Sequence, residues 1–111
     1  MMDKNLTNRI LADLADLLHA NRAEIISANQ ADVASCPETD AVIVDRLKVD
    51  DKKIDTMIAS VRQVASAPSP IEAVLSSHIR EDGLRIENRA VPFGTILIIY
   101  EARPDVTIEA A

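Results

Sequence analysis

The first third of the chain has the residue pattern of amphipathic helices. From Asp3 to about Ala34 the pattern is helical, and the apolar residues of its first half fall within an arc of about 140° on a helical wheel, opposite a polar side. The members of this first stripe are Leu6, Ile10, Leu11, Leu14, Leu17 and Leu18. A kink or restart is expected around residues 19–22, where Asn21 is available as an N-cap. Pro37 ends the region.

A second helical stripe follows further along. After a short amphipathic piece around residues 41–47, Asp50 or Asp51 can cap a helix whose apolar positions lie within about 120°. Those positions are Ile54, Met57, Ile58, Val61 and Val64. The prolines in Ser66–Pro70 stop this helix. Because each long helix has one apolar side, both are expected to pack on another element.

From Ile71 the pattern alternates, which is typical of strands. Asp82-Gly83 favours a two-residue hairpin turn, because both residue types accept positive φ angles. That turn predicts the pairs Glu81–Leu84, Arg80–Arg85, Ile79–Ile86 and His78–Glu87. It also predicts an apolar face of Leu75, Ile79, Leu84, Ile86 and Ala90, and a polar face of Ser76, His78, Arg80, Arg85, Glu87 and Arg89. An isolated hairpin is marginal in water, so another sheet edge or helix is expected against it.

The run Thr95–Tyr100 is continuous, apolar and largely β-branched, the pattern of a strand buried on both faces of a parallel sheet. A turn over Glu101–Asp105 ends it, and a helix-compatible stretch starts at Val106. Such a strand needs neighbours, and no second run of this kind lies upstream. The sequence is therefore interpreted as the beginning of a larger α/β protein, cut off just after its sheet starts.

Composition narrows the possible functions. One Phe, one Tyr and no Trp, with a net charge of −6, disfavour nucleic-acid binding, which uses stacking rings and basic patches. With two glycines there is neither a P-loop nor a dinucleotide-binding glycine motif.

A single cysteine, Cys36, excludes a disulfide within the chain and is expected to be an inert thiol after a helix. His78 is expected to be a half-exposed partner of Glu87. The spacing predicts no metal site and no Ser/His/Asp arrangement, and no membrane partner or signal peptide is indicated, so the cytoplasm is the default compartment.

The tail carries the most specific motif. Val91-Pro-Phe-Gly94, a hydrophobic strand and then Tyr100-Glu-Ala-Arg-Pro-Asp-Val-Thr107 resemble γ-glutamyl phosphate reductase, whose pattern is V-P-x-G, a strand and Y-E-[SA]-R-P-[ND]-V-T. That family, also called glutamate-5-semialdehyde dehydrogenase, belongs to the aldehyde dehydrogenase superfamily. Upstream stretches resemble the family in the same order: Ile26–Asp32, Val44–Leu47, Val61–Val64 and Gly83–Glu87.

The resemblance implies an oxidoreductase of proline biosynthesis that converts γ-glutamyl phosphate to glutamate 5-semialdehyde and phosphate with NADPH. In the family a cysteine thiolate attacks the acyl phosphate, and hydride then reduces the thioester. The family nucleophile lies far downstream, and Cys36 matches no such position. The chain is therefore expected to be an N-terminal fragment that is inactive alone. The choice of NADP over NAD rests on the resemblance only.

The same resemblance indicates the site residues. It implies cofactor contact, mostly through backbone, at Tyr100, Glu101, Ala102, Arg103 and Pro104, because ligands of open α/β folds lie at the carboxyl ends of strands. Arg103 suits a phosphate or carboxylate, and its alternative role is an ion pair with Glu101 or Asp105. Asp105 stands where many members have Asn, which in the superfamily donates to the developing oxyanion. An ionised Asp cannot donate, so Asp105 is protonated or turned away, or other groups hold the oxyanion.

The expected fold is α/β and incomplete. Residues 1–70 would be a helical segment of the cofactor-binding domain, 71–90 a β-hairpin of the oligomerisation module, and 91–111 the start of a Rossmann-like nucleotide-binding sheet. By resemblance the hairpin supports a homo-oligomer. The alternative hypothesis is a non-catalytic helical interaction module in which the hairpin pairs edge to edge with another copy.

Overall fold

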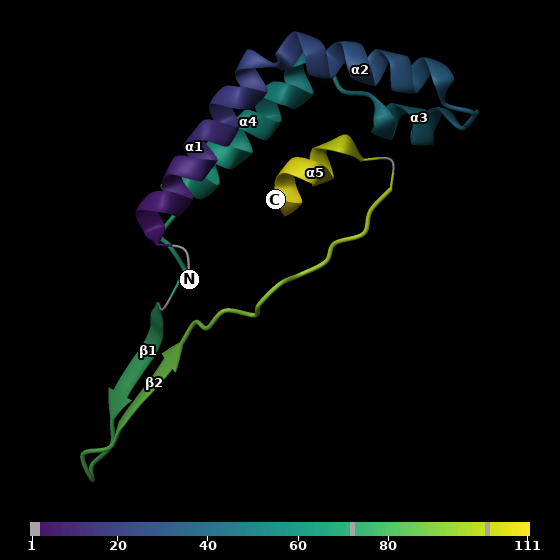
Figure 1. Cartoon of the computed structure of the whole chain (residues 1–111). Coiled ribbons are helices and arrows are strands. Elements are labelled where there is room, and N and C mark those ends of the chain that lie inside the picture. Colours follow the sequence, from purple (N-terminus) through teal and green to yellow (C-terminus); the bar gives the residue numbers. More distant parts are fainter. Residues whose placement is uncertain (1–2, 72, 102) are drawn as a thin grey trace. The chain divides into compact units, whose positions relative to one another are not determined.

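The structure is a computed structural model that describes residues 3–71, 73–101 and 103–111. Its described elements are α1 (Lys4–Ala20), α2 (Arg22–Ser35), α3 (Ala41–Leu47), α4 (Asp51–Ser66), β1 (Val74–Ile79), β2 (Arg85–Arg89) and α5 (Pro104–Ala110) (Figure 1). They form two compact units. The helical unit comprises Met1–Ser66 together with Ile98–Ala111, and the hairpin unit comprises Ala67–Leu97.

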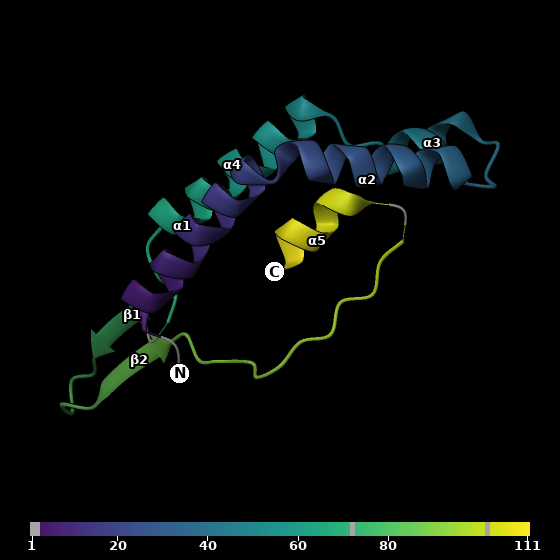
Figure 2. The same cartoon turned by 45° about the horizontal axis from the view of Figure 1, so that its top comes forward.

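Aspartates set the starts of three helices. Asp3, Asp40 and Asp50 accept hydrogen bonds from the backbone N–H groups of Leu6 at 2.8 Å, Val42 at 2.9 Å and Lys53 at 2.8 Å. Each bond satisfies a donor that a helix N-terminus otherwise leaves unpaired. The predicted restart is confirmed, since α1 and α2 meet at a bend in both views (Figures 1 and 2).

Asn21 is the N-cap residue of α2, as predicted, and its carbonyl accepts the Ile25 N–H at 3.0 Å. Its side chain, however, makes no cap hydrogen bond to α2. Its Nδ2 instead donates to the carbonyl of Leu17 at 2.8 Å, and its backbone N–H donates to Leu17 and His19 carbonyls. The residue therefore ends α1, because its donors pair with carbonyls that α1 leaves free.

The core lies between α1 and α4. It consists of buried side chains on the two helices and on the link before α4, namely Ala15, Leu18, Val49, Ile54, Met57, Ile58 and Val61. Ile54, with 0% of its surface exposed, lies at the centre of this set. Ile108 of α5 packs against the same core. Four of the five predicted positions on α4 are thus confirmed, whereas Val64 is exposed, as are Leu6, Ile10 and Leu17 of the first stripe.

In the hairpin unit, β1 and β2 pair antiparallel, but with a register one residue away from the predicted one. Ile79 lies opposite Arg85, and His78 opposite Ile86. The loop has three residues, because the Gly83 N–H donates to the Arg80 carbonyl at 2.9 Å and the Arg80 N–H to the Leu84 carbonyl at 2.8 Å. Gly83, at φ 85°, follows a tight turn and adds one residue to the loop.

The register change overturns the predicted faces. A one-residue slip moves side chains to the opposite face, so Ile79 and Ile86 no longer share one. Glu87 lies opposite Ser77, not His78, and pairs with Arg85 at 3.4 Å and Arg89 at 2.5 Å on its own strand. The predicted apolar face and the predicted His78–Glu87 pair are therefore both wrong.

The run from Thr95 to Tyr100 is not a strand in this structure. The described residues provide no ladder partner for it, and the two strands that they contain pair only with each other. Its apolar side chains are exposed to solvent, with 83% of the surface of Leu97 and 86% of that of Ile99 accessible. The predicted burial is absent because a lone strand has no neighbour to satisfy its backbone groups or cover its faces.

Shortening the central core residue should lower stability in a graded way. Ile54→Val is expected to lower the free energy of unfolding by about 0.5–1.5 kcal/mol, and Ile54→Ala by about 2–5 kcal/mol, because each leaves a cavity between α1 and α4. Val64→Ala is the matched control on an exposed position of the same helix and should change it by less than about 0.5 kcal/mol. Urea unfolding followed by circular dichroism measures all three, and equal losses for Ile54→Ala and Val64→Ala would contradict the position of the core.

Candidate functional site

The residues of the predicted cofactor site lie on the stretch that leads into α5. Tyr100, which precedes the turn, and Glu101, with which the turn begins, are exposed, and Arg103 is exposed at the N-cap position. Pro104 is the first helical residue, where its missing N–H costs no hydrogen bond. Asp105 is partly buried in the first turn, a favourable place for a negative charge. Ala102 lies outside the described residues.

Two hydrogen bonds define how the chain enters α5. The N–H of Val106 donates to the Arg103 carbonyl at 3.0 Å. The hydroxyl groups of Tyr100 and Thr107 share the second bond, across seven positions of the sequence. Tyr100 and Thr107 thus lie together although the turn separates them, whereas no ion pair among the described residues joins Arg103 to Glu101 or Asp105.

The donors on this stretch suit a dinucleotide. Arg103 offers an exposed guanidinium, which matches a phosphate in geometry and charge. Within the described residues, no hydrogen bond is made by the N–H groups of Glu101 and Arg103. The stretch is exposed over most of its length, so it does not enclose a ligand by itself.

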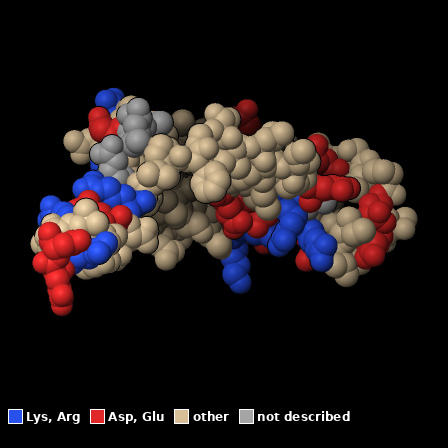
Figure 3. Space-filling view, turned by 90° about the horizontal axis from the view of Figure 1, so that it is seen from below, with Lys and Arg blue, Asp and Glu red and all other residues tan. Residues whose placement is uncertain are grey.

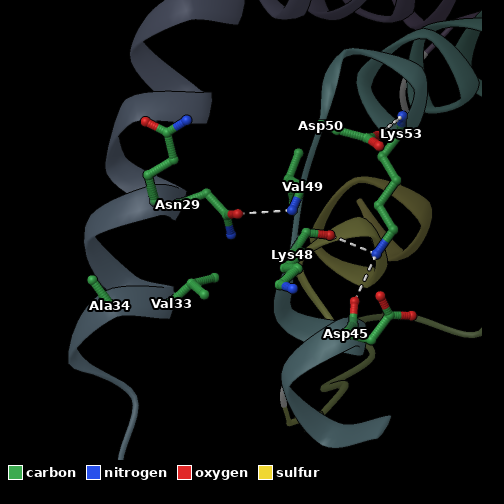
Figure 4. A pocket seen from close by; sticks show the side chains of 9 residues that line it. Asn29, Val33, Ala34, Asp45, Lys48, Val49, Asp50 and Lys53 are labelled. Atoms are coloured by element: carbon green, nitrogen blue, oxygen red, sulfur yellow. Dashed lines mark hydrogen bonds between the residues drawn. The ribbon is translucent and has the colours of Figure 1, made fainter. Parts of the chain in front are cut away.

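The helical unit also contains a cavity of about 420 Å³, which sequence reasoning did not predict. Its walls are α2 on one side and the end of α3 with the start of α4 on the other (Figure 4). Asn29 of α2 is buried there, donates from Nδ2 to the Leu47 carbonyl at 2.8 Å and accepts the Val49 N–H at 2.7 Å. One amide side chain thus pairs with both sides of the α3–α4 link.

The charged group at the opposite wall is used within the chain as well. The ammonium of Lys53 donates to the carbonyls of Lys48 at 2.6 Å and Asp45 at 3.4 Å (Figure 4). These carbonyls end α3, and a cation stabilises such an end. We therefore assign a structural role to the polar groups of this cavity. Asn29 and Lys53 hold the α3–α4 link, which positions α4, and we call this pair of contacts the joint.

An ion-pair cluster holds the bend between α1 and α2 to the start of α4. Arg22 donates to the Asp51 carbonyl at 3.0 Å, to its carboxylate at 3.2 Å and to the Asp55 carboxylate at 2.5 Å. The hydrogen bond to Asp55 is the main cause that raises the pKa of Arg22 above its usual value, and Asp51 adds to it. The ion pairs therefore join the bend to the start of α4, and α1 and α4 run antiparallel because the end of one meets the start of the other.

The other features considered from the sequence are Cys36, a metal site, a membrane span and a basic surface. Cys36 is partly buried at the end of α2, where its N–H donates to the Val33 carbonyl at 3.3 Å. Within the described ranges, no group of three or more His, Cys, Asp or Glu side chains could hold a metal ion. No helix among the described residues has the length and apolarity needed to span a bilayer. On the face drawn in Figure 3, acidic and basic side chains are interspersed with uncharged ones and form no continuous basic surface.

Comparison with known proteins shows which proteins the chain is similar to. No family model matches the chain. The γ-glutamyl phosphate reductases of Thermotoga petrophila and of Xanthomonas axonopodis pv. citri are 51% identical over 67 residues and 41% over 73, which is 60% and 66% of this chain and 16% and 18% of theirs. The crystal structure of γ-glutamyl phosphate reductase from Thermotoga maritima matches 98% of the chain and 27% of its own length, at 40% identity and a TM-score of 0.85.

The chain is thus similar to γ-glutamyl phosphate reductases, and in the structural comparison the similarity extends over nearly its whole length. The resemblance identified from the Tyr100–Thr107 motif is confirmed. The chain spans 16–18% of the length of these curated relatives. The match to a solved reductase also supports the helices and the hairpin, while the Rossmann-like strand stays a prediction.

The joint at Asn29 yields a stability prediction. Asn29→Ala removes both hydrogen bonds to the α3–α4 link and leaves the buried Val49 N–H unpaired, so the free energy of unfolding should fall by about 2–3 kcal/mol. Gln30→Ala, on the exposed neighbouring position, is the control and should change it by less than about 0.5 kcal/mol. Chemical denaturation of both variants measures this difference, and an unchanged midpoint for Asn29→Ala would show that the joint does not hold α4.

Proposed function

We propose that this chain is part of an enzyme that reduces γ-glutamyl phosphate to glutamate 5-semialdehyde in L-proline biosynthesis. In that reaction the acyl carbon gains a hydride from NADPH and loses phosphate, and NADP+ is formed. The observation that carries the proposal is the match of 98% of the chain to a solved γ-glutamyl phosphate reductase at 40% identity. A small acidic substrate and the cytoplasm are part of the same proposal.

We assign to the stretch before α5 the contact with the nicotinamide cofactor, which supplies hydride when bound. Arg103 would hold a phosphate through its guanidinium, and the N–H groups of Glu101 and Arg103 would donate to the same ligand. Tyr100 and Pro104 would shape the backbone at either end, and Ala102 belongs to the same stretch by its place in the motif. The choice of NADP over NAD rests on the family resemblance alone.

The covalent step has no group in the described site. The single thiol, Cys36, ends α2, and no described hydrogen bond or ion pair of its side chain would stabilise a thiolate. Asp105 lies where its carboxylate stabilises the first turn of α5, and an ionised carboxylate cannot donate to an oxyanion. We therefore propose that the chain by itself does not catalyse the reduction and that Asp105 is not its oxyanion donor.

We further propose that the hairpin unit associates with a second copy of the chain. Each residue of β1 is exposed, including Leu75 and Ile79, and a two-stranded sheet has two free edges. Pairing between copies would cover these side chains and join the strands. This observation also favours the second candidate function, a non-catalytic dimerisation module, which differs from the first by having no affinity for NADPH.

The enzyme proposal predicts cofactor affinity without turnover. The isolated chain should show no NADP-dependent reaction with glutamate 5-semialdehyde and phosphate, while NADPH should shift the amide resonances of Glu101 and Arg103. Arg103→Gln should weaken this binding about tenfold because a charge-assisted contact to phosphate is lost. Arg9→Gln, on the exposed side of α1, is the control and should leave it unchanged. Turnover by the chain, or NADPH binding that ignores Arg103, would contradict the proposal.

The association proposal is tested by sedimentation. The chain should form a concentration-dependent dimer, and Leu75→Lys with Ile79→Lys should shift it to monomer because charges are introduced where copies meet. Leu17→Lys, at an equally exposed leucine of the helical unit, should leave the association intact. A monomer at all concentrations, or the same loss with Leu17→Lys, would rule out the hairpin as the site of contact.

A further inference from the structure

A single side-chain contact closes the turn that leads into α5. Tyr100 precedes the turn, and Thr107 lies in the first helical turn of α5. Their hydroxyl groups share a hydrogen bond. Both residues are exposed, so the bond lies at the surface beside the turn. Among the described residues, no other side-chain hydrogen bond spans residues 101–106.

One end of this contact is already anchored. Ile108, the neighbour of Thr107, packs against the core between α1 and α4. It lines a cavity of about 340 Å³ together with Leu11, Leu14 and Val61. Thr107 is therefore held in place by burial of the next residue, and a bond to Thr107 transmits that restraint to Tyr100.

The turn has few other restraints. Pro104 fixes one φ angle, and the Val106 N–H donates to the Arg103 carbonyl. α5 has seven residues, and a helix of that length is marginal by itself. A hydrogen bond between Tyr100 and Thr107 should therefore change the order of Arg103 to Val106 more than a surface hydrogen bond usually does, because it removes conformational freedom from the described residues between its ends.

We propose that Tyr100 and Thr107 form a side-chain clasp that fixes Arg103, Pro104 and Asp105 on the helical unit, and that Tyr100 is a positioning residue for the cofactor-binding backbone. This inference rests on the proposed function for its second half. Because the phenol hydroxyl is hydrogen-bonded to Thr107, Tyr100 would act on cofactor binding by positioning the turn, not by touching the cofactor. A direct contact from the phenol would instead make Thr107 irrelevant to binding.

A double-mutant cycle in the 111-residue chain tests the clasp. Tyr100→Phe and Thr107→Val each remove one hydroxyl while keeping size, so each should speed amide exchange of Val106 and Ile108 about 3- to 10-fold. The double variant should exchange no faster than either single one, because all three lack the same bond. Thr107→Ser keeps the hydroxyl and should stay near the parent, as should Thr56→Val on α4.

Titration with NADPH provides the second readout. Tyr100→Phe and Thr107→Val should lower the NADPH affinity, measured from the shifts of the Glu101 and Arg103 amides, by the same factor of about threefold or more. Thr107→Ser, which keeps the hydroxyl group, should retain the affinity of the parent chain. Additive effects on exchange, or unchanged exchange with Thr107→Val, would overturn the clasp itself. Weaker binding with Tyr100→Phe alone would overturn positioning in favour of direct contact. If the parent chain gives no NADPH shifts while the exchange cycle is coupled, the cofactor role and the positioning role fail and the clasp stands.

Discussion

The antiparallel contact between α1 and α4 is the interaction on which the described helical unit depends. Ile54 is fully buried at its centre, and the other core residues surround it. α5 has no fold of its own at seven residues and docks on this contact through Ile108. The turn that carries Arg103 is therefore positioned by the core of two other helices, although the nearer one in the sequence, α4, already ends at Ser66.

Two polar groups keep the contact in register. Arg22 joins the bend between α1 and α2 to Asp51 and Asp55 of α4. Asn29 holds the α3–α4 link, so that α4 begins where its apolar side faces α1. The sequence contains a signal for Asn29, which is a poor helix former in mid-helix near Ile25 and Ile26. That signal indicates only an unusual position, and the hydrogen-bond partners are some twenty residues away.

The sequence predicted elements better than pairings. Periodicity located the long helices and most of the buried positions on α4, because burial on one side of a helix leaves a repeat. The register of the hairpin was not predictable in this way. Asp82-Gly83 is compatible with a two-residue loop and with a three-residue loop that ends in a left-handed glycine, and the two differ by one residue. Likewise, the run from Thr95 to Tyr100 specifies a segment that needs cover without specifying what covers it.

The candidate site was predicted from its motif, and the structure adds a contact that holds the residues around it. The Tyr100–Thr107 bond depends on the path of the turn, so the residue types alone could not reveal it. The most direct test of this account is amide exchange of the dilute chain, resolved by residue. We expect slow exchange in α1 and α4, intermediate exchange in α5, and rapid exchange from Ile96 to Ile99. Strong protection of Ile96–Ile99 together with an unprotected α5 would contradict the claim that the helical core, and not a strand, holds the turn.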